Sequence, residues 1–218
     1  MKKICALLPI LVFLRFFSSC ISLESLWPNV AGPIDNEASL LVVEAGIAGE
    51  GALFNSNASG WAPWVVDAQG EVVPFKTFDG EPRLDSFFYS ENLESGKYTL
   101  KGFFHVYIDY SKLPAEVIAL YAPFDDYSYH VKQEFPLDEP VEVNLGKGEV
   151  ATLGRYFITY SWTEGLTGTT DQRWRVNPSS VIISGDKSDK KALRVAQNWR
   201  TPHWTLWNMR NSEAAADN

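Results

Sequence analysis

The sequence predicts a mainly β fold: an antiparallel β-sandwich with one or two C-terminal helices packed on it. Short runs of apolar residues, several of them alternating, recur over residues 38–185 and are separated by Gly, Pro, Asp and Asn. No helical period of useful length is found before residue 186 within that region. The 218 residues are 45% hydrophobic and 21% charged, which is enough to build one buried core.

The first 19 residues predict a secretory signal peptide. Two lysines follow the initial methionine, and the apolar run over residues 4–17 is interrupted only by Pro9 and Arg15. That run is shorter than the roughly 20 residues that a membrane-spanning helix needs, and no later run is long and apolar enough.

A cysteine follows the apolar run in the order Phe16, Phe17, Ser18, Ser19, Cys20. Small residues at the two positions before a cysteine resemble a bacterial lipobox, and Phe17 in place of the usual Leu resembles the relaxed lipoboxes of spirochaetes. The resemblance implies that Cys20 receives a diacylglyceryl group, that the chain is cut before it, and that the new N-terminus is acylated. The alternative is an ordinary signal peptide cut near Ser19, with Cys20 incidental.

The mature chain is expected to have no intramolecular disulfide and to be acidic. Residues 21–218 contain no cysteine, so the domain must rely on its own core. The net charge of −8 becomes −11 once Lys2, Lys3 and Arg15 leave with the signal peptide. This charge argues against nucleic acid as a partner. Anionic headgroups repel such a surface, so membrane attachment would depend on the lipid at Cys20.

Residues 20–37 are expected to form the lipidated N-terminus and a flexible tether. They contain many Ser, Pro, Asn, Gly and Asp residues and show no repeating hydrophobic pattern.

The sandwich is assigned to residues 38–185. Its first run, residues 40–45, is apolar except for Glu44 and suits a core strand. Residues 61–67 and 71–75 flank a hairpin turn at residues 68–70. Further strands are expected at 86–90, 97–109, 129–135, 141–145, 149–153, 155–162, 173–176 and 181–184.

The strongest strand is predicted over residues 97–109. A strict period of two places one set of residues on a single face, which we expect to be core: Tyr98, Leu100, Gly102, Phe104, Val106 and Ile108. His105 is then expected on the opposite face. Residues 129–135 alternate less cleanly through Tyr129, Val131 and Gln133.

Residues 186–211 are predicted to be helical. Asp186 or Ser188 can cap a helix whose apolar stripe follows the helical period at Ala192, Val195, Ala196 and Trp199. A second short helix is expected after Thr201 and Pro202, with Trp204 and Trp207 about one turn apart. Residues 212–218 are predicted to be a disordered tail.

One local motif carries a family resemblance. Residues 93–100 have the form L-x-x-G-x-Y-x-L, which marks a hairpin turn at Gly96 that enters a central strand at Tyr98. The motif resembles the L-x-P-G-x-Y-x-V stretch of transthyretin-like and carboxypeptidase-regulatory-like domains, with Ser95 in place of Pro. Residues 143–154 resemble the companion hairpin of bacterial lipoproteins built on such domains. The resemblance implies an immunoglobulin-like or transthyretin-like sandwich that serves as a structural or ligand-binding module, and it supplies no catalytic residues.

The residues offer little catalytic chemistry. His105, His130 and His203 are interpreted as packed or surface histidines, and no G-x-S-x-G, H-E-x-x-H or cysteine-rich metal spacing is present. The carboxylate pairs at 125–126 and 138–139 are interpreted as solvated loop charges. We therefore expect no enzymatic activity, no catalytic residues, no metal and no cofactor.

Trp61 and Trp64 are the candidate ligand contacts. Three positions apart on a strand, they face opposite sides, and an exposed indole can stack on a sugar ring or anchor a partner. The alternative is that the tryptophans pack. The remaining tryptophans from residue 162 onward are expected to close the sandwich against the C-terminal helices.

Together these features predict a lipid-anchored protein of the bacterial cell envelope, at the outer membrane or its periplasmic face. Its noncatalytic sandwich would bind an envelope protein, a host protein or a glycan through its loops. One alternative is a secreted carbohydrate-binding or carbohydrate-active domain that uses Trp61 and Trp64. Another is a structural subunit of an envelope complex that exposes an apolar, Trp-rich helix.

Overall fold

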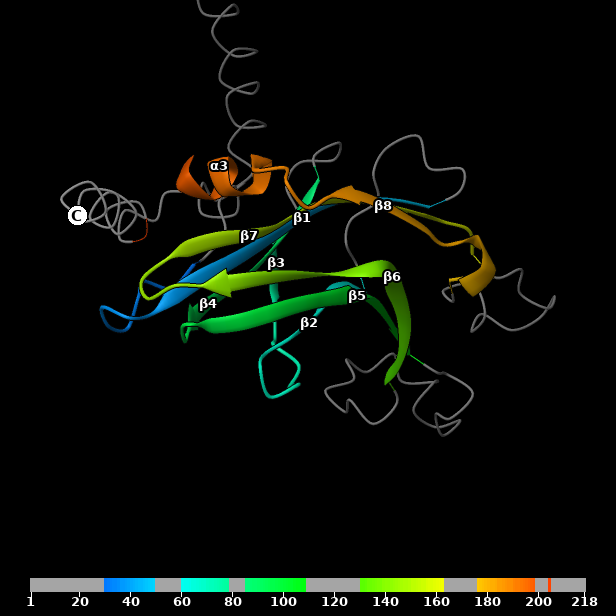
Figure 1. Cartoon of the computed structure of the whole chain (residues 1–218). Coiled ribbons are helices and arrows are strands. Elements are labelled where there is room, and N and C mark those ends of the chain that lie inside the picture. Colours follow the sequence, from blue (N-terminus) through cyan, green and yellow to red (C-terminus); the bar gives the residue numbers. More distant parts are fainter. Residues whose placement is uncertain are drawn as a thin grey trace, which may run out of the picture.

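Two β-sheets pack against each other in the computed structural model, which describes residues 30–49, 60–78, 85–108, 130–162, 176–198 and 204 (Figure 1). The five-stranded sheet has the order β3-β4-β1-β7-β8, and the three-stranded sheet has the order β2-β5-β6. The prediction of a mainly β sandwich is confirmed.

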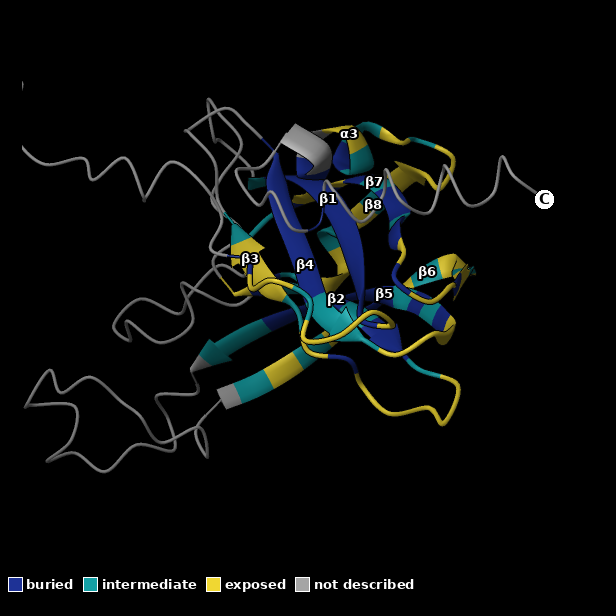
Figure 2. Cartoon of the chain, turned by 90° about the vertical axis from the view of Figure 1, so that its left-hand side faces the viewer, coloured by how far each residue is buried: buried dark blue, intermediate teal, exposed yellow. Residues whose placement is uncertain are grey.

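The five-stranded sheet is built around β1 (Ser39–Gly49). Its neighbours are β4 (Ser86–Leu93) and β7 (Val150–Tyr160), followed at the two edges by β3 (Lys76–Phe78) and β8 (Ile182–Asp186). β1 pairs with β7 in parallel, while the other pairs are antiparallel, so the sandwich is not purely antiparallel. Most of β1 is buried on both faces, which explains its nearly continuous apolar run (Figure 2).

The three-stranded sheet consists of β2 (Trp61–Val66), β5 (Gly96–Ile108) and β6 (His130–Leu145). The predicted strands 129–135 and 141–145 are both parts of β6, and the charges at 138–139 lie within that strand and not in a loop. The predicted strands 149–153 and 155–162 likewise fall mostly within the single strand β7. The turn at residues 68–70 is present, but Val72 makes only one bridge, to Val66.

A β-bulge changes which residues of β5 face the core. Leu100 pairs with Val141 of β6, whereas Gly102 pairs with Pro136, so the register shifts between them. Beyond the bulge Phe103, and not Phe104, joins the core between the sheets. The prediction of one uninterrupted core face is therefore wrong, because the bulge moves the alternation by one residue.

Gly102 permits this bulge. A Cβ atom there would lie 2.1 Å from the carbonyl oxygen of Phe135 on β6, which is too close for any other residue. The glycine therefore allows the two strands to approach where the register changes.

A second apolar cluster covers the outer face of the five-stranded sheet. α3 (Lys191–Asn198) places Ala192 and Ala196 against Leu40 and Val42 of β1, so these two positions of the predicted stripe are confirmed. The side chains of Val195 and Trp199 lie outside the described residues. Trp204 belongs to the same cluster, and its indole Nε1 donates to the carbonyl of Ala31 at 2.6 Å.

The start of α3 differs from the prediction. Residues 187–188 form a turn after β8, and the helix begins at Lys191. The side chain of Asp189 accepts a hydrogen bond from the backbone N–H of Lys191 at 2.8 Å, and so satisfies a free donor of the first turn. A 3-10 turn, η5 (Pro178–Ser180), precedes β8.

Several predicted segments lie outside the described residues: 1–19, Cys20, most of 199–211 including His203, and 212–218. Of the predicted tether, residues 30–37 are described; Val30 is buried in the outer cluster, and the N–H of Ile34 donates to the side chain of Asn92. Among the described segments no helix has both the length and the apolar character needed to cross a membrane.

Candidate functional site

The longest connections of the fold leave the sandwich at one end. Gly49 at the end of β1 pairs with Tyr160 at the end of β7, and the ring of Tyr160 lies 5.4 Å from that of Trp61 at the start of β2. Ile108 at the end of β5 pairs with His130 at the start of β6. Residues 50–60, 109–129 and 161–177 connect the elements there, and we call this the loop end. Sandwiches often bind partners through such connections.

A buried aromatic cluster fills the loop end between the sheets. The ring of Trp61 lies 5.1 Å from that of His105 and 5.2 Å from that of Phe135. Trp162 meets Tyr160 edge-on at 4.9 Å and His105 at 6.1 Å. We call these five residues the loop-end cluster. Four of them lie on β2, β5, β6 and β7, and the fifth, Trp162, lies two residues after the end of β7. Their contacts join the ends of the two sheets.

A row of three polar side chains crosses the three-stranded sheet; Trp61 and His105 belong to the loop-end cluster, and Gln133 lies beside it. The pairing register aligns Trp61 with His105 and His105 with Gln133, so all three share one face. Within the part of the chain that the structure describes, three buried atoms of the row have no hydrogen-bond partner: Trp61 Nε1, His105 Nδ1 and Gln133 Oε1. Leaving such an atom unpaired costs about 1–3 kcal/mol, so a row of three is unusual in a folded core.

The protonation of this polar row is set by burial. His105 is only 3% exposed, and burial lowers its pKa to about 4, so the imidazole is neutral at pH 7. The Nε2 of Gln133 donates to the carbonyl of Val176 at 3.3 Å, which leaves the amide oxygen free to accept. The row therefore offers one N–H donor, one oxygen acceptor and a neutral imidazole nitrogen.

The structure separates the two predicted ligand contacts. Trp61 is in the loop-end cluster, whereas Trp64 lies on the outer face of the sheet, half-buried and stacked on Phe104 at 5.5 Å. Sequence reasoning did not find His105 as a neighbour of Trp61, because the bulge that turns it inward leaves no local signal. The alternation through Val131 and Gln133 was the available sign that Gln133 faces inward.

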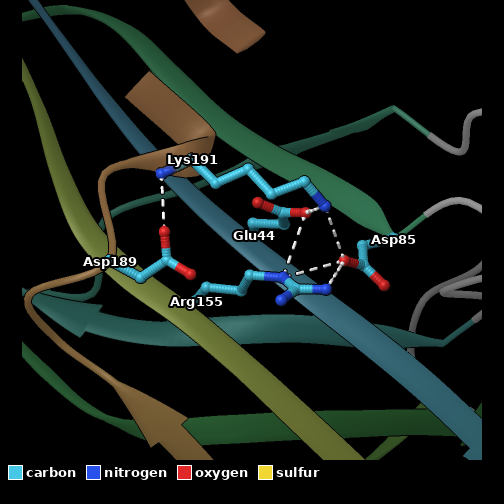
Figure 3. A network of polar contacts seen from close by, with 5 residues as sticks. All are labelled: Glu44, Asp85, Arg155, Asp189 and Lys191. Atoms are coloured by element: carbon cyan, nitrogen blue, oxygen red, sulfur yellow. Dashed lines mark hydrogen bonds and ion pairs between the residues drawn. The ribbon is translucent and has the colours of Figure 1, made fainter. Parts of the chain in front are cut away.

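A second polar group, the charge cluster, lies under α3 on the five-stranded sheet (Figure 3). It joins Glu44, Asp85, Arg155 and Lys191, which come from β1, the residue before β4, β7 and α3. Lys191 Nζ lies 2.6 Å from Glu44 Oε1 and 3.2 Å from Asp85 Oδ2, and Arg155 Nη2 lies 2.5 Å from Asp85 Oδ2. Arg155 Nε is also 3.3 Å from Glu44 Oε1.

The two carboxyl groups of the charge cluster are shifted in opposite directions. Burial, followed by the hydrogen bond with Asp85, raises the pKa of Glu44 to about 7. Burial also acts to raise the pKa of Asp85, but hydrogen bonds with Glu44, Arg155 and Lys191 outweigh it and lower that pKa. Below neutral pH the proton of the pair therefore sits on Glu44. Glu44 is fully buried beneath α3, and both carboxyl groups contact Lys191 of that helix. The two carboxyl groups therefore hold α3 on the sheet, and that of Glu44 is not accessible to a dissolved substrate.

Other predicted site residues have simple placements. The carboxylate pair at 125–126 lies outside the described residues. Among the residues that the structure describes, no group of three or more His, Cys, Asp or Glu side chains is arranged to hold a metal ion.

No known protein family, curated protein or solved structure matches this chain, so its function has to be argued from its own residues.

Proposed function

We propose that this chain is a lipid-anchored protein of the bacterial envelope whose β-sandwich is a noncatalytic binding module. The anchor is the acylated Cys20 that the lipobox-like sequence implies, at the outer membrane or its periplasmic face. The binding surface is the loop end. The observation that supports the proposal is the direction of β1, which begins nine residues after Val30, on the chain side of Cys20, and ends at the loop end.

β1 separates the proposed binding surface from the end of the domain that follows the proposed anchor. Its eleven residues, Ser39–Gly49, extend over roughly 35 Å at about 3.3 Å per residue. Val30 packs beside Ala192 and Trp204 near the start of this strand, and Cys20 precedes Val30 by ten residues. Such a stretch reaches at most about 35 Å, so an anchored domain would stay within about that distance of the membrane.

The transthyretin-like resemblance supports a noncatalytic role. Its motif forms the turn from β4 into β5, where Tyr98 is buried in the core and its hydroxyl donates to the carbonyl of Glu94 at 2.8 Å. β4 and β5 belong to different sheets, so the motif forms a crossing between the sheets and the predicted hairpin is wrong. Its residues serve the packing of that crossing, and nothing in it needs a substrate.

The test is the intact mass of the protein recovered from the membrane fraction of a bacterial host. We expect a chain that starts at Cys20 and carries acyl mass. Cys20→Ala should lose that mass and the membrane association, while Cys5→Ala, which changes the other cysteine, should keep both. An unmodified chain cut near Ser19 in the wild type would contradict the anchor and leave a secreted domain.

A secreted carbohydrate-binding domain is the second candidate, and the placement of Trp64 favours it. Its half-buried ring lies on the outer face of β2, with Lys101 Nζ 5.5 Å from the ring centroid. Binding on a glycan array that Trp64→Ala abolishes would support this candidate. Phe157→Ala is the control, because Phe157 is a partly exposed ring on the other sheet.

A further inference from the structure

We infer that the outer edge of β8 is an interaction surface, at which an extended peptide of a partner protein adds as a further strand. The peptide that fits this edge has alternating apolar and basic side chains. β8 is the last strand of the five-stranded sheet, with β7 on one side and no strand on the other among the described residues. The inference goes beyond the proposed function and does not depend on the anchor at Cys20.

β8 lacks the protection that the other three sheet edges have. β3 is three residues long and begins with Lys76, and β2 contains Pro63. β6 contains Pro136 and Pro140, and its pairing with β5 is interrupted between Pro136 and Val141. Short length, lysine, proline and bulges keep sheet edges from pairing with other chains. β8 contains no proline and no lysine, and its pairing with β7 is uninterrupted, so its edge is open to a further strand.

The outer face of this edge exposes apolar surface. Two of the four large apolar side chains exposed in the described part of the chain lie here: Ile182 of β8, which is 67% exposed, and Phe157 of β7. Phe157 pairs with Ser184, two residues beyond Ile182, so the two apolar side chains are diagonal neighbours on one face. A side chain of an added strand would lie beside Ile182 and remove apolar surface from water.

The inner face of the edge borders a pocket between β6 and β8. The pocket has a volume of about 320 Å³ and is lined by residues 135–138 of β6 and by residues 178 and 181–183. Ile183 pairs with Ile158 of β7, and both contribute to the core between the sheets, Ile183 as a partly buried member. Alternate side chains of an added strand would therefore point over Ile183 and into this pocket, while the others lie beside Ile182.

Carboxylates beside the pocket favour a basic partner. Asp138 lines the pocket and its neighbour Glu139 is exposed. Within the described residues neither of them makes an ion pair. Asp186 ends β8 and is exposed, and Lys187 follows only beyond the strand. Lysine or arginine side chains of an added strand would meet Asp138 and Glu139, whereas a second copy of this chain would bring another net charge of −8 to the edge.

The experiment measures the binding of a fluorescent synthetic peptide, Lys-Val-Lys-Val-Lys-Val-Lys, to the full-length protein by anisotropy. We expect a Kd of about 100 µM or below. The same peptide with Glu in place of each Lys should bind at least about tenfold more weakly. Amide hydrogen exchange, followed by NMR, should become slower on peptide binding at the N–H groups of β8 that do not bond to β7.

Two variants test the edge and its charge. Ile182→Lys removes apolar surface and places a like charge beside the peptide, so it should weaken binding at least about tenfold. Ile34→Lys is the matched control, because Ile34 is 76% exposed and lies beside Asn92 of β4, with β1 and β7 between it and β8. It should bind as the wild type does.

Asp138→Asn removes the carboxylate of the pocket and should weaken binding about three- to fivefold. Glu142→Gln is its control, because Glu142 is a carboxylate of β6 that does not line the pocket, and it should change the Kd less than about twofold. Thermal unfolding of each variant checks that it is folded.

Any of four results would overturn the inference. The first is the absence of binding at about 1 mM peptide. The second is equal binding by the wild type and folded Ile182→Lys, which would place the peptide elsewhere. The third is equal binding of the acidic peptide, which would remove the argument from charge. The fourth is a dimer in sedimentation velocity that Ile182→Lys dissolves, because a second copy would then occupy the edge.

Discussion

Replacing the buried carboxyl of Glu44 should change how the stability of the protein depends on pH. Glu44 is fully buried in the charge cluster, with Lys191 Nζ at 2.6 Å and Arg155 Nε at 3.3 Å from its Oε1. Glu44→Gln keeps the size and one hydrogen-bonding oxygen but cannot titrate. The substitution therefore isolates the protonation of this one group.

The magnitude follows from the raised pKa of Glu44, which moves from 4.5 to about 7 on folding. The folded chain holds the proton more tightly than the unfolded chain does. The contribution of this group to stability is therefore full below pH 4.5 and is lost as the pH rises through about 7. At about 1.4 kcal/mol for each pH unit, the loss reaches about 3 kcal/mol.

The assay is urea unfolding, followed by tryptophan fluorescence, from pH 4.5 to about 8. The unfolding free energy of Glu44→Gln minus that of the wild type should rise by about 3 kcal/mol from pH 4.5 to about 8. A constant offset from the lost ion pairs does not change this rise. The pKa of Asp85 is lowered from its ordinary value of 3.8, so Asp85 changes the pH dependence of stability only below pH 3.8. That pH lies outside the range of the assay. Glu142→Gln is the control, since its carboxylate is 57% exposed beside Lys97. A difference that does not vary with pH would refute the reasoning.

Three further predictions concern the core. Burial lowers the pKa of His105 from 6.5 to about 4, so the contribution of His105 to stability falls by up to about 3 kcal/mol as the pH falls from 6.5 toward 4; because Glu44 acts in the opposite direction over this range, the measure is the unfolding free energy of His105→Phe minus that of the wild type, which should rise by up to about 3 kcal/mol in the same urea assay. Gly102→Ala should destabilise the fold by about 3 kcal/mol or more, because its Cβ would meet a carbonyl of β6 at 2.1 Å; Gly96→Ala, with nothing within 4 Å, should stay within about 0.5 kcal/mol of the wild type by thermal unfolding. Trp204→Phe should cost about 1 kcal/mol by removing the hydrogen bond to Ala31, and hydrogen exchange of α3 should accelerate.

Much of the fold was predictable because it follows from local patterns. The apolar run at residues 40–45 predicted a core strand, and it lies in the first half of β1. The spacing of Ala192 and Ala196 predicted the buried stripe of α3. The three-residue spacing of Trp61 and Trp64 predicted opposite faces, which the structure shows.

One residue of the candidate site could be predicted from the sequence, and its neighbours could not. Trp61 was chosen from its sequence, but its neighbours His105 and Gln133 depend on the register of β2, β5 and β6. His105 faces the core only because the bulge at Gly102 moves the alternation by one residue. Glu44 was visible only as an interruption in an apolar run, and its partner Lys191 stands 147 positions away.

Local residue patterns were sufficient to locate most of the strands, the apolar face of a strand up to its first bulge, and the point where the chain becomes helical. These properties depend on residues a few positions apart, whose side chains repeat with the period of the backbone. Contacts between distant segments set the parallel pairing of β1 with β7, the register of β5 on β6, and the assembly of the polar row and the charge cluster. Those features depend on hydrogen bonds and close contacts between residues far apart in the chain, which no local pattern records.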